Sequence, residues 1–255
     1  MPRRLPLTTA LALALALSPA TASAASDTYD DAAREALRAE IRAYLLENPE
    51  VIFEAVAAFE ERNTQASAEM ERVLIEINAG EIFFDNHSWV GGNPDGDLTL
   101  VEFVDYRCSF CQRAFDEVMA FAERDGNIRL VMKEFPILGP QSVEMSRFAV
   151  AVLQLGGDDA YFTVHERLLN WEGPISDSSL GRLAADLGLD ADQVLARMRS
   201  DEVTAVLDEN RGLAQRLEIA GTPTFVLGDG EDGEMIRGML PADGLAQVAA
   251  EIRNP

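Results

Sequence analysis

The stretch Val101-Glu102-Phe103-Val104-Asp105-Tyr106-Arg107-Cys108-Ser109-Phe110-Cys111 is an apolar strand that runs directly into two cysteines with two residues between them. These are the only cysteines of the 255-residue chain. A Cys-x-x-Cys pair between a strand and a helix is typical of a dithiol that cycles between reduced and disulfide forms, because the second sulfur reaches the first across one helical turn. The unpaired N–H groups of a helix beginning near Ser109 favour negative charge at Cys108. We therefore expect Cys108 to be the attacking thiolate and Cys111 its partner.

Three other interpretations of the cysteine pair are open. A structural zinc site normally needs four Cys or His ligands, and only His87 and His165 remain, at no recognisable spacing. A purely structural disulfide would close so short a loop that it restricts the unfolded chain very little. Two unpaired core thiols would require a reducing compartment. We rank all three below a redox pair.

The N-terminal residues 1–24 have the pattern of an export signal. Arg3 and Arg4 precede an apolar run from Leu5 to Leu17, and Ala22-Ser23-Ala24 forms a small-x-small cleavage site. The run is too short to be a stable membrane anchor. We expect cleavage after Ala24 and a mature chain in an oxidising compartment, a bacterial periplasm, where a dithiol can be redox active.

The composition excludes one class of partner. The net charge is −23, whereas binding to phosphate backbones demands clustered Lys and Arg, so we expect no nucleic acid partner. The apolar content of 47% is ample for a core of one or two domains.

Residues 25–80 are predicted to form a separate helical arm. Asn48-Pro49 interrupts the arm and Gly80 is expected to end it. Its apolar residues recur at helical spacing in three stripes, which are Ala33, Leu37, Ile41, Tyr44 and Leu45, then Ile52, Ala55, Val56 and Phe59, then Ala66, Met70, Val73, Leu74 and Ile77. Isolated amphipathic helices are marginal in water, so the stripes either fold back on the main domain or pair with other copies in a homo-oligomer through residues 27–78.

Residues 81–135 begin the main domain. Ile82-Phe83-Phe84 is a candidate short strand, and the Gly91 to Gly96 cluster is expected to be a turn, because it lacks the ending of a phosphate-binding loop. An amphipathic helix follows the cysteines and ends at Asp125-Gly126, before a strand that starts at Ile128. Strand, helix and strand in this order predict two parallel strands.

Two charged residues interrupt otherwise apolar strands. Glu102 lies six positions before Cys108, and Lys133 ends the following strand. If their side chains meet beneath the cysteines, they would pair and pass protons to or from Cys111. The alternative is that strand alternation points one or both of them to solvent.

The chain turns helical at about 138–218 and then returns to strands. Five apolar stripes predict a helical insertion, beginning with the helices Met145 to Leu153 and Tyr161 to Leu169, and His165 is assigned a packing or surface role. Pro223 precedes the apolar strand that ends near Leu227. We expect a cis Thr222-Pro223 bond that leaves backbone groups of Thr222 free to pair with an extended substrate; an ordinary loop proline is the alternative.

Taken together, these residues resemble the DsbA family of thioredoxin-fold disulfide oxidoreductases. The resemblance rests on the Cys108 and Cys111 pair, Glu102 as the buried acid, and Thr222-Pro223 as the cis-proline loop. The segments Ile41 to Glu50 and Lys133 to Pro140 look like its ScsC and Com1-like branch. The implied fold is α/β, a thioredoxin fold over residues 81–255 with an inserted helical subdomain and a preceding helical arm. The Ser109-Phe110 dipeptide departs from the family, because strong oxidases carry a histidine there.

The resemblance implies disulfide exchange with exported proteins through an exposed Cys108 sulfur, without a cofactor. Its branch implies oligomers and isomerase or reductase activity, maintained by a DsbD/ScsB-like membrane partner. The runner-up is a monomeric oxidase recharged by a DsbB-like membrane protein. A different class also stays open, a carrier of copper or another soft metal that uses the two thiolates as ligands.

Overall fold

The computed structural model describes residues 30–254. The predicted export signal with its cleavage site, and the first residues of the predicted arm, lie outside the described residues. The contacts within the chain divide it into two compact units, and the boundary falls between Glu61 and Arg62. Among the helices of residues 30–254, none has the length and apolar character needed to cross a membrane.

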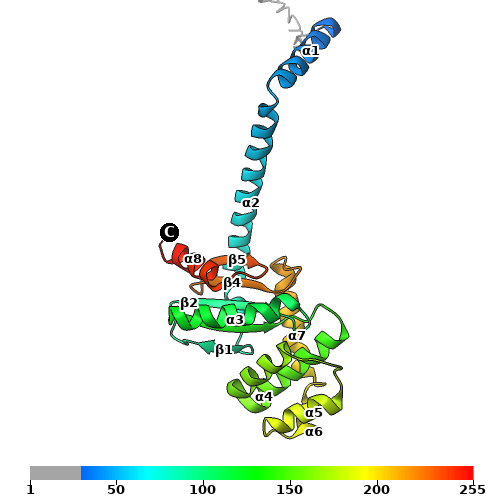
Figure 1. Ribbon diagram of the computed structural model, residues 1–255, viewed down its shortest axis with the longest axis vertical. Helices are drawn as coiled ribbons and strands as arrows, with labels where there is room; N and C mark the ends of the chain where they lie inside the picture. The colour runs from blue at the N-terminus through cyan, green and yellow to red at the C-terminus, as the bar shows by residue number, and fades with distance from the viewer. Residues whose placement is uncertain (1–29, 255) are drawn as a thin grey trace, which may run out of the picture. The chain divides into compact units, whose positions relative to one another are not determined.

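Helices and strands follow one another in an order that places four helices between the third and fourth strands (Figure 1). The elements are α1 (Asp31–Glu47), α2 (Glu50–Phe83), β1 (Trp89–Gly92), β2 (Leu98–Val104), α3 (Ser109–Asp125), β3 (Ile128–Glu134), α4 (Pro140–Leu169), α5 (Asp177–Asp186), α6 (Ala191–Arg197), α7 (Asp201–Arg216), β4 (Thr224–Gly228), β5 (Gly233–Arg237) and α8 (Ala242–Arg253).

The strands form one sheet in the order β1-β3-β2-β4-β5. β2 and β3 are parallel and α3 connects them, which confirms the strand, helix and strand unit predicted around the cysteines. β1, β4 and β5 join their neighbours antiparallel. The resulting mixed sheet with flanking helices is the α/β thioredoxin fold expected from the sequence.

One predicted strand is wrong and one observed strand was missed. Ile82 and Phe83 belong to the last turn of α2 and are buried. The first strand of the chain is β1, an edge strand of the sheet, which contains Gly91 and Gly92 from the predicted turn. A run of three apolar residues fits the buried face of a helix as well as a strand, so the sequence pattern alone does not separate the two.

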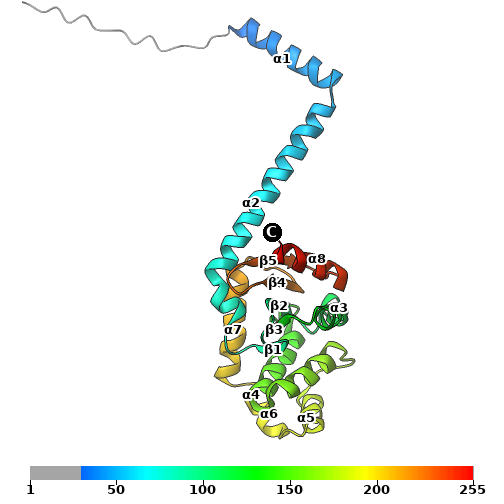
Figure 2. The same ribbon diagram turned by 90° about the vertical axis from the view of Figure 1, so that its left-hand side faces the viewer.

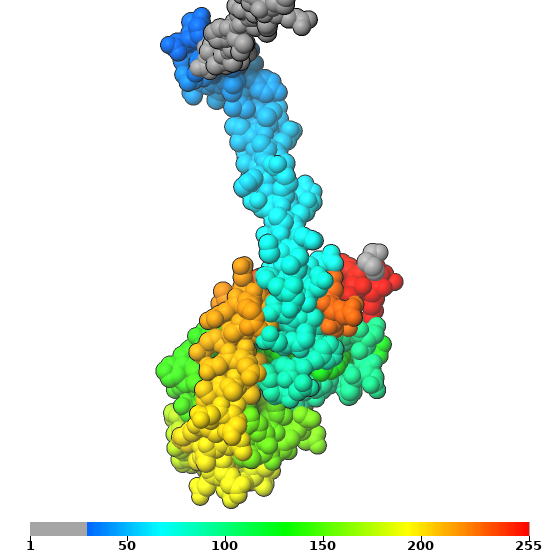
Figure 3. All heavy atoms as spheres, turned by 180° about the vertical axis from the view of Figure 1, so that it is seen from behind, coloured from blue at the N-terminus to red at the C-terminus, as the bar shows by residue number. Residues whose placement is uncertain are grey.

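The two faces of the sheet carry separate apolar cores. One core lies between the sheet and α3, α4 and α8, around residues such as Leu100, Val118 and Phe148 (Figure 2). The other lies between the sheet and the C-terminal turns of α2 together with α7, around Val101 and Leu217. Seen from behind, these turns of α2 and α7 lie side by side (Figure 3). Because helices cover both faces, every side chain of β2 is buried, and so is every side chain of β3 except that of the half-buried Arg129.

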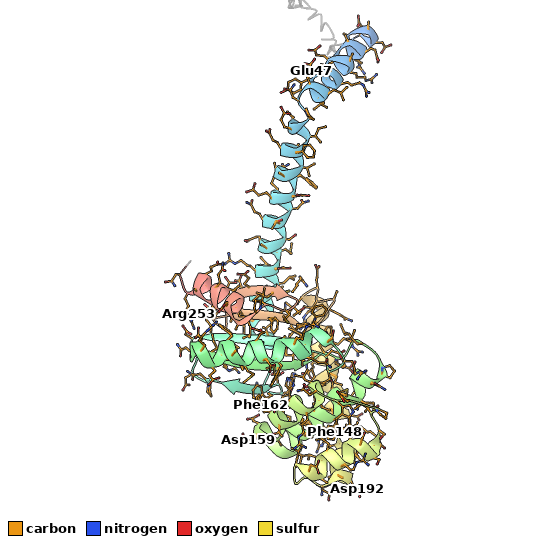
Figure 4. The ribbon with its side chains drawn as sticks, viewed as in Figure 1. Glu47, Phe148, Asp159, Phe162, Asp192 and Arg253 are labelled. Atoms are coloured by element: carbon orange, nitrogen blue, oxygen red, sulfur yellow. The ribbon has the colours of Figure 1, made fainter. Side chains whose placement is uncertain are left out.

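The helices α4 to α7 lie where the sequence predicts a helical insertion. α4 carries both of the first two predicted stripes, and Gly157 separates them with a left-handed φ of 76°. Phe148 precedes this kink and Phe162 follows it (Figure 4). Glycine adopts this backbone conformation without the penalty of a side chain, so the chain changes direction and presents both stripes to the core.

α8 is fastened to the rest of its unit by Arg253 (Figure 4). Its guanidinium lies 2.7 Å from the Asp97 carboxylate, just before β2, and 2.8 Å from the Asp125 carboxylate at the end of α3. The two ion pairs connect the C-terminal helix to the start of β2 and to the end of α3, the two elements between which Cys108 lies.

α1 and the first turns of α2 expose their apolar stripes. α1 buries none of its side chains, and α2 continues through Gly80 to Phe83, so the expectation that Gly80 ends a helix is wrong. A glycine inside a helix costs about 1 kcal/mol, which burial of Ile82 and Phe83 readily offsets. The large apolar residues exposed on residues 30–61 are Leu37, Ile41, Tyr44, Leu46, Ile52, Phe53, Val56 and Phe59.

Candidate functional site

The two cysteines lie where β2 gives way to α3. Cys108 is the N-cap residue of α3, and its carbonyl accepts the N–H of Gln112 at 3.1 Å. The backbone N–H of Cys108 donates to the Asp105 carbonyl at 3.0 Å. Both thiols are free, with Cys108 6% exposed and Cys111 fully buried. The helix therefore places Cys108 as the outer sulfur and Cys111 as the inner one, although Cys108 is less exposed than the sequence predicts.

The loop before β4 lies against the outer cysteine. The Thr222-Pro223 bond is cis, and the Cys108 thiol donates to the Thr222 carbonyl oxygen at 3.1 Å. The Pro223 carbonyl accepts the N–H of Gly238 at 2.9 Å, which connects the loop to the residue after β5. The loop thus lies beside Cys108, as predicted. The Thr222 carbonyl, however, accepts a hydrogen bond from the Cys108 thiol, whereas the sequence analysis expected it to be free.

A shallow groove of about 430 Å³ opens beside this loop. Phe110, from the dipeptide between the cysteines, lines the groove with 54% of its surface exposed. The guanidinium of Arg113 lies 4.5 Å from the centre of the Phe110 ring, a cation–π contact that supports the ring at the protein surface. Residues 220–224 and 237–239 complete the lining, so an extended chain laid along the groove would meet mostly apolar side chains and backbone.

Glu102 is buried on the face of the sheet that α3 and α4 cover. It is 2% exposed and lies beside Met132 in the register of β2 and β3. Burial, together with the charge of Glu134, raises the pKa of Glu102 to about 8. Burial and then the charge of Glu102 raise the pKa of the Cys111 thiol. The inner thiol therefore needs a base close to it before it can react at neutral pH.

The predicted pairing of Glu102 with Lys133 is wrong. Lys133 is the register partner of Phe103 and points to the opposite face of the sheet, because successive residues of a strand alternate. There its ammonium group, fully buried, binds the carboxylate of Asp85. Lys133 therefore lies apart from the Cys111 side of the sheet.

The Asp85–Lys133 pair predicts a pH dependence of stability. Burial raises the pKa of Asp85, but the Lys133 ammonium and hydrogen bonds from Lys133 and Ser88 outweigh it and hold the pKa at about 2, below the ordinary 3.8. A lowered folded-state pKa stabilises the fold above about pH 4, and this stabilisation is lost as the pH falls toward 2. Asp85→Asn should flatten that fall. It should also reduce the free energy of unfolding at pH 7 by about 3–5 kcal/mol, because Lys133 stays buried without its counter-charge.

Urea unfolding at a series of pH values measures both effects. Asp243→Asn is the matched control, since Asp243 forms an exposed ion pair with Arg124 and such pairs contribute little. An Asp85→Asn curve parallel to the wild-type curve between pH 4 and 2 would contradict the assignment.

A buried polar cluster near the cysteines was not predicted. The hydroxyls of Tyr106 and Tyr161 both lie close to Glu134 Oε1, at 2.6 and 2.7 Å. His165 Nδ1 lies 2.9 Å from the Tyr106 hydroxyl, which settles the sequence-based choice for this histidine in favour of a packed side chain. Tyr106 stands two residues before Cys108, a hint visible in the sequence, but only the fold brings α4 to it. We name this group of four side chains the Glu134 cluster.

The described residues offer no evident metal site. Within residues 30–254, no group of three or more His, Cys, Asp and Glu side chains is arranged to hold a metal ion. The two cysteines of residues 30–254 therefore belong to no such group.

A mixed α/β fold with a Cys-x-x-Cys pair at the start of a helix and a cis-proline loop against its outer sulfur defines the class of thioredoxin-fold dithiol proteins. Residues 99–252 match the family described as DSBA-like thioredoxin domain, and the chain belongs to that family. Residues 34–66 match the copper resistance protein ScsC N-terminal domain. Both parts of the resemblance drawn from the sequence are confirmed, and family and site together support a thiol-disulfide oxidoreductase activity.

Solved structures agree with this assignment. A thioredoxin-like oxidoreductase from Silicibacter pomeroyi DSS-3 is 36% identical, with a TM-score of 0.62 over 69% of this chain and 98% of that chain. Two more distant structures share the fold. Salmonella enterica Typhimurium BcfH is 23% identical, with a TM-score of 0.72 over 87% of this chain and 96% of that chain. A linker-deletion mutant of Proteus mirabilis ScsC is 23% identical, with a TM-score of 0.63 over 89% and 98%.

Curated relatives match only in part. A Na(+)/H(+) antiporter NhaA 1 from Mycobacterium sp. (strain KMS) is 29% identical over 143 residues, which are 53% of this chain and 22% of the antiporter. The antiporter from Salinispora arenicola (strain CNS-205) is 25% identical over 62% of this chain and 25% of its own length. The chain thus spans about a quarter or less of these relatives.

Proposed function

We propose that this chain is a periplasmic thiol-disulfide oxidoreductase that exchanges disulfides with exported proteins and acts as an isomerase or reductase. The observation that carries the proposal is the Cys108 thiol held 3.1 Å from the Thr222 carbonyl, beside an open groove of about 430 Å³. A substrate strand laid against Thr222 and Pro223 would present its own sulfur to Cys108 by strand addition.

The exchange proceeds in two steps. The Cys108 thiolate attacks one sulfur of a substrate disulfide, forming the mixed disulfide and releasing the other substrate sulfur as a thiolate. In isomerase work that released thiolate, or another from the substrate, attacks the mixed disulfide and regenerates Cys108. When this fails, Cys111 attacks Cys108, the substrate leaves reduced, and the two cysteines become the oxidised pair.

Glu102 is proposed to take the proton that Cys111 loses in the second step. Its charge acts on the Cys111 thiol, and both groups are buried on the same face of the sheet. The pKa of about 8 for Glu102 means that it exchanges protons within a pH unit or so of neutrality.

Glu102→Gln should slow the release of substrate by Cys111 about a hundredfold at pH 8. The amide keeps the shape of the side chain but accepts no proton, so Cys111 must ionise without a neighbouring base. Stopped-flow measurement of that release from the Cys108 mixed disulfide tests it, and Glu123→Gln on the exposed side of α3 is the control. An unchanged rate would remove Glu102 from the mechanism.

The direction of exchange is proposed from the N-terminal half of the chain. The match to the ScsC N-terminal domain and the exposed apolar stripes of α1 and α2 favour an oligomer that presents several dithiols to one substrate. Such work requires reduced cysteines, supplied by a DsbD/ScsB-like membrane partner. The alternative is a monomeric DsbA-like oxidase recharged by a DsbB-like partner.

The redox state of the cysteines in cells separates these directions. Thiol trapping of the native chain should find Cys108 and Cys111 mainly reduced. A mainly oxidised pair would instead favour the oxidase. The location is proposed from the export signal over residues 1–24; a solved relative from Salmonella enterica serovar Typhimurium is described as a periplasmic thioredoxin-like protein.

A further inference from the structure

Glu134 shares a face of the sheet with Glu102. Met132 is the register partner of Glu102, and Glu134, two residues further along β3, points the same way. Both carboxyls are at least 97% buried between the sheet and the helices that cover it. Like charges on one buried face of a sheet oppose each other's ionisation, and the charge of Glu134 adds to burial in raising the pKa of Glu102.

In the Glu134 cluster, neutral hydroxyl groups and not a cation bind the carboxyl of Glu134. When Glu134 is ionised, the hydroxyls of Tyr106 and Tyr161 both donate to Oε1, so the Tyr106 oxygen is left to accept the Nδ1–H of His165. Burial lowers the pKa of His165 to about 3, so the ring is neutral. The carboxylate is therefore stabilised by hydrogen-bond dipoles that do not cancel its charge, and that charge still acts on Glu102.

The cluster is also joined to the segment that carries the outer cysteine. Tyr106 lies between β2 and α3, and its carbonyl accepts the side-chain amide of Gln112 at 3.3 Å. The ionisable groups around Glu134 are Glu102, Asp105 and Tyr106 from β2 and the loop after it, and Tyr161 and His165 from α4. Cys111 of α3 interacts with Glu102.

We propose that Glu134 is a positioning residue whose charge decides when Glu102 can accept the proton of Cys111. This inference rests on the proposed function. In the step concerned, Cys111 gives its proton to the Glu102 carboxylate and its sulfur bonds to Cys108. The bond between Cys108 and the substrate breaks, and the substrate leaves as a thiolate that then takes up a proton. Cys111 is oxidised because it gives up the two electrons that reduce the substrate sulfur. While Glu134 is negative, Glu102 keeps its proton to a higher pH and the step is held back.

The test removes the charge of residue 134 and keeps the shape of its side chain. In Glu134→Gln the amide oxygen still accepts the two tyrosine hydroxyls, but the repulsion is gone. The NMR titration of the ¹³C-labelled Glu102 carboxyl, assigned with Glu102→Gln, should show a midpoint lower by about one pH unit. The pH profile for release of glutathione from its mixed disulfide with Cys108 should move by the same amount. Glu123→Gln removes one exposed charge from α3 and should move neither.

A double variant separates coupling from general disturbance. In the Glu102→Gln background, Glu134→Gln should leave the pH profile of glutathione release where it was, because its effect passes through Glu102. A shift as large as in the wild-type background would overturn the proposal. So would a folded Glu134→Gln protein with an unmoved Glu102 titration.

A second variant covers the case in which Glu134→Gln does not fold. Tyr161→Phe removes one donor from the carboxylate, so Glu134 is neutral up to a higher pH and the Glu102 midpoint should fall in the same direction, by less. An unmoved midpoint in this variant also overturns the proposal. The carboxyl titration needs no substrate, so a protein that shows the coupling yet fails to exchange disulfides would refute only the proposed function.

Discussion

Replacing Cys108 with alanine is expected to reduce thiol-dependent turnover of insulin disulfides to the background rate of the reductant alone. Cys108 is the outer sulfur, at the N-cap of α3, and the buried Cys111 cannot reach a substrate in its place. Cys111→Ser should retain the first attack but lose the second. It should therefore accumulate a mixed disulfide with substrate, visible by mass spectrometry and released by added thiol.

The Cys108→Ala and Cys111→Ser variants also distinguish a disulfide oxidoreductase from a protein that binds and carries copper. A copper carrier that uses the two thiolates as ligands would give no thiol-dependent turnover in the wild type, and both variants would lose metal equally. An oxidoreductase gives turnover that depends on Cys108 and a trapped adduct that depends on the absence of Cys111. Thr204→Val, a change on α7 away from the two cysteines, is the folding control. Turnover that persists in Cys108→Ala would contradict the assignment of the attacking sulfur.

Changing the apolar stripe at the start of α2 should convert an oligomer into single chains. Ile52, Val56 and Phe59 recur at helical spacing and are 47–58% exposed. A stripe of this kind is marginal in water unless another surface covers it. The mature chain should therefore scatter light as an oligomer, whereas the combined Val56→Glu and Phe59→Glu variant should have the mass of one chain, because buried carboxylates facing one another are costly.

The positions of residues on α2 decide both the control and the use of point variants in place of a truncation. Ala57→Glu adds a carboxylate on the other side of the same turn and should leave the oligomer intact. Truncation at Glu81 would be a poorer test, since it removes Ile75, which lies about two turns before the end of α2 and belongs to the core between the sheet and α7. Equal masses for the wild type and the double variant, both of one chain, would refute the role of the arm.

Much of the fold could be predicted because its signals are local. The periodicity of α3, the left-handed Gly126 that ends it, and the apolar strands on either side all depend on residues close in the chain. The two wrong predictions of secondary structure also arose from short stretches of sequence. Ile82 and Phe83 are too few to distinguish a strand from a helix end, and the glycines of β1 suggested a turn because glycine is rare inside strands.

The candidate site divides in the same way. Cys108, Cys111 and Pro223 stand out by residue type and spacing alone, and Glu102 stands out as a charge in an apolar strand. Its electrostatic neighbour could not be predicted, because Lys133 and Glu134 are adjacent in sequence and only the register of β2 and β3 decides which of them faces Glu102. Tyr161 and His165 come from a helix whose approach to the sheet leaves no trace in their own sequence.

The type of chemistry follows from the sequence alone, since two sulfurs one helical turn apart, after a strand, are placed to form a disulfide with each other. The electrostatics of the site depend on the fold, since the protonation of a buried group depends on which charges the packing brings near it. Strand alternation places Lys133 with Asp85 on one face, and leaves Glu102 with a second carboxyl on the other.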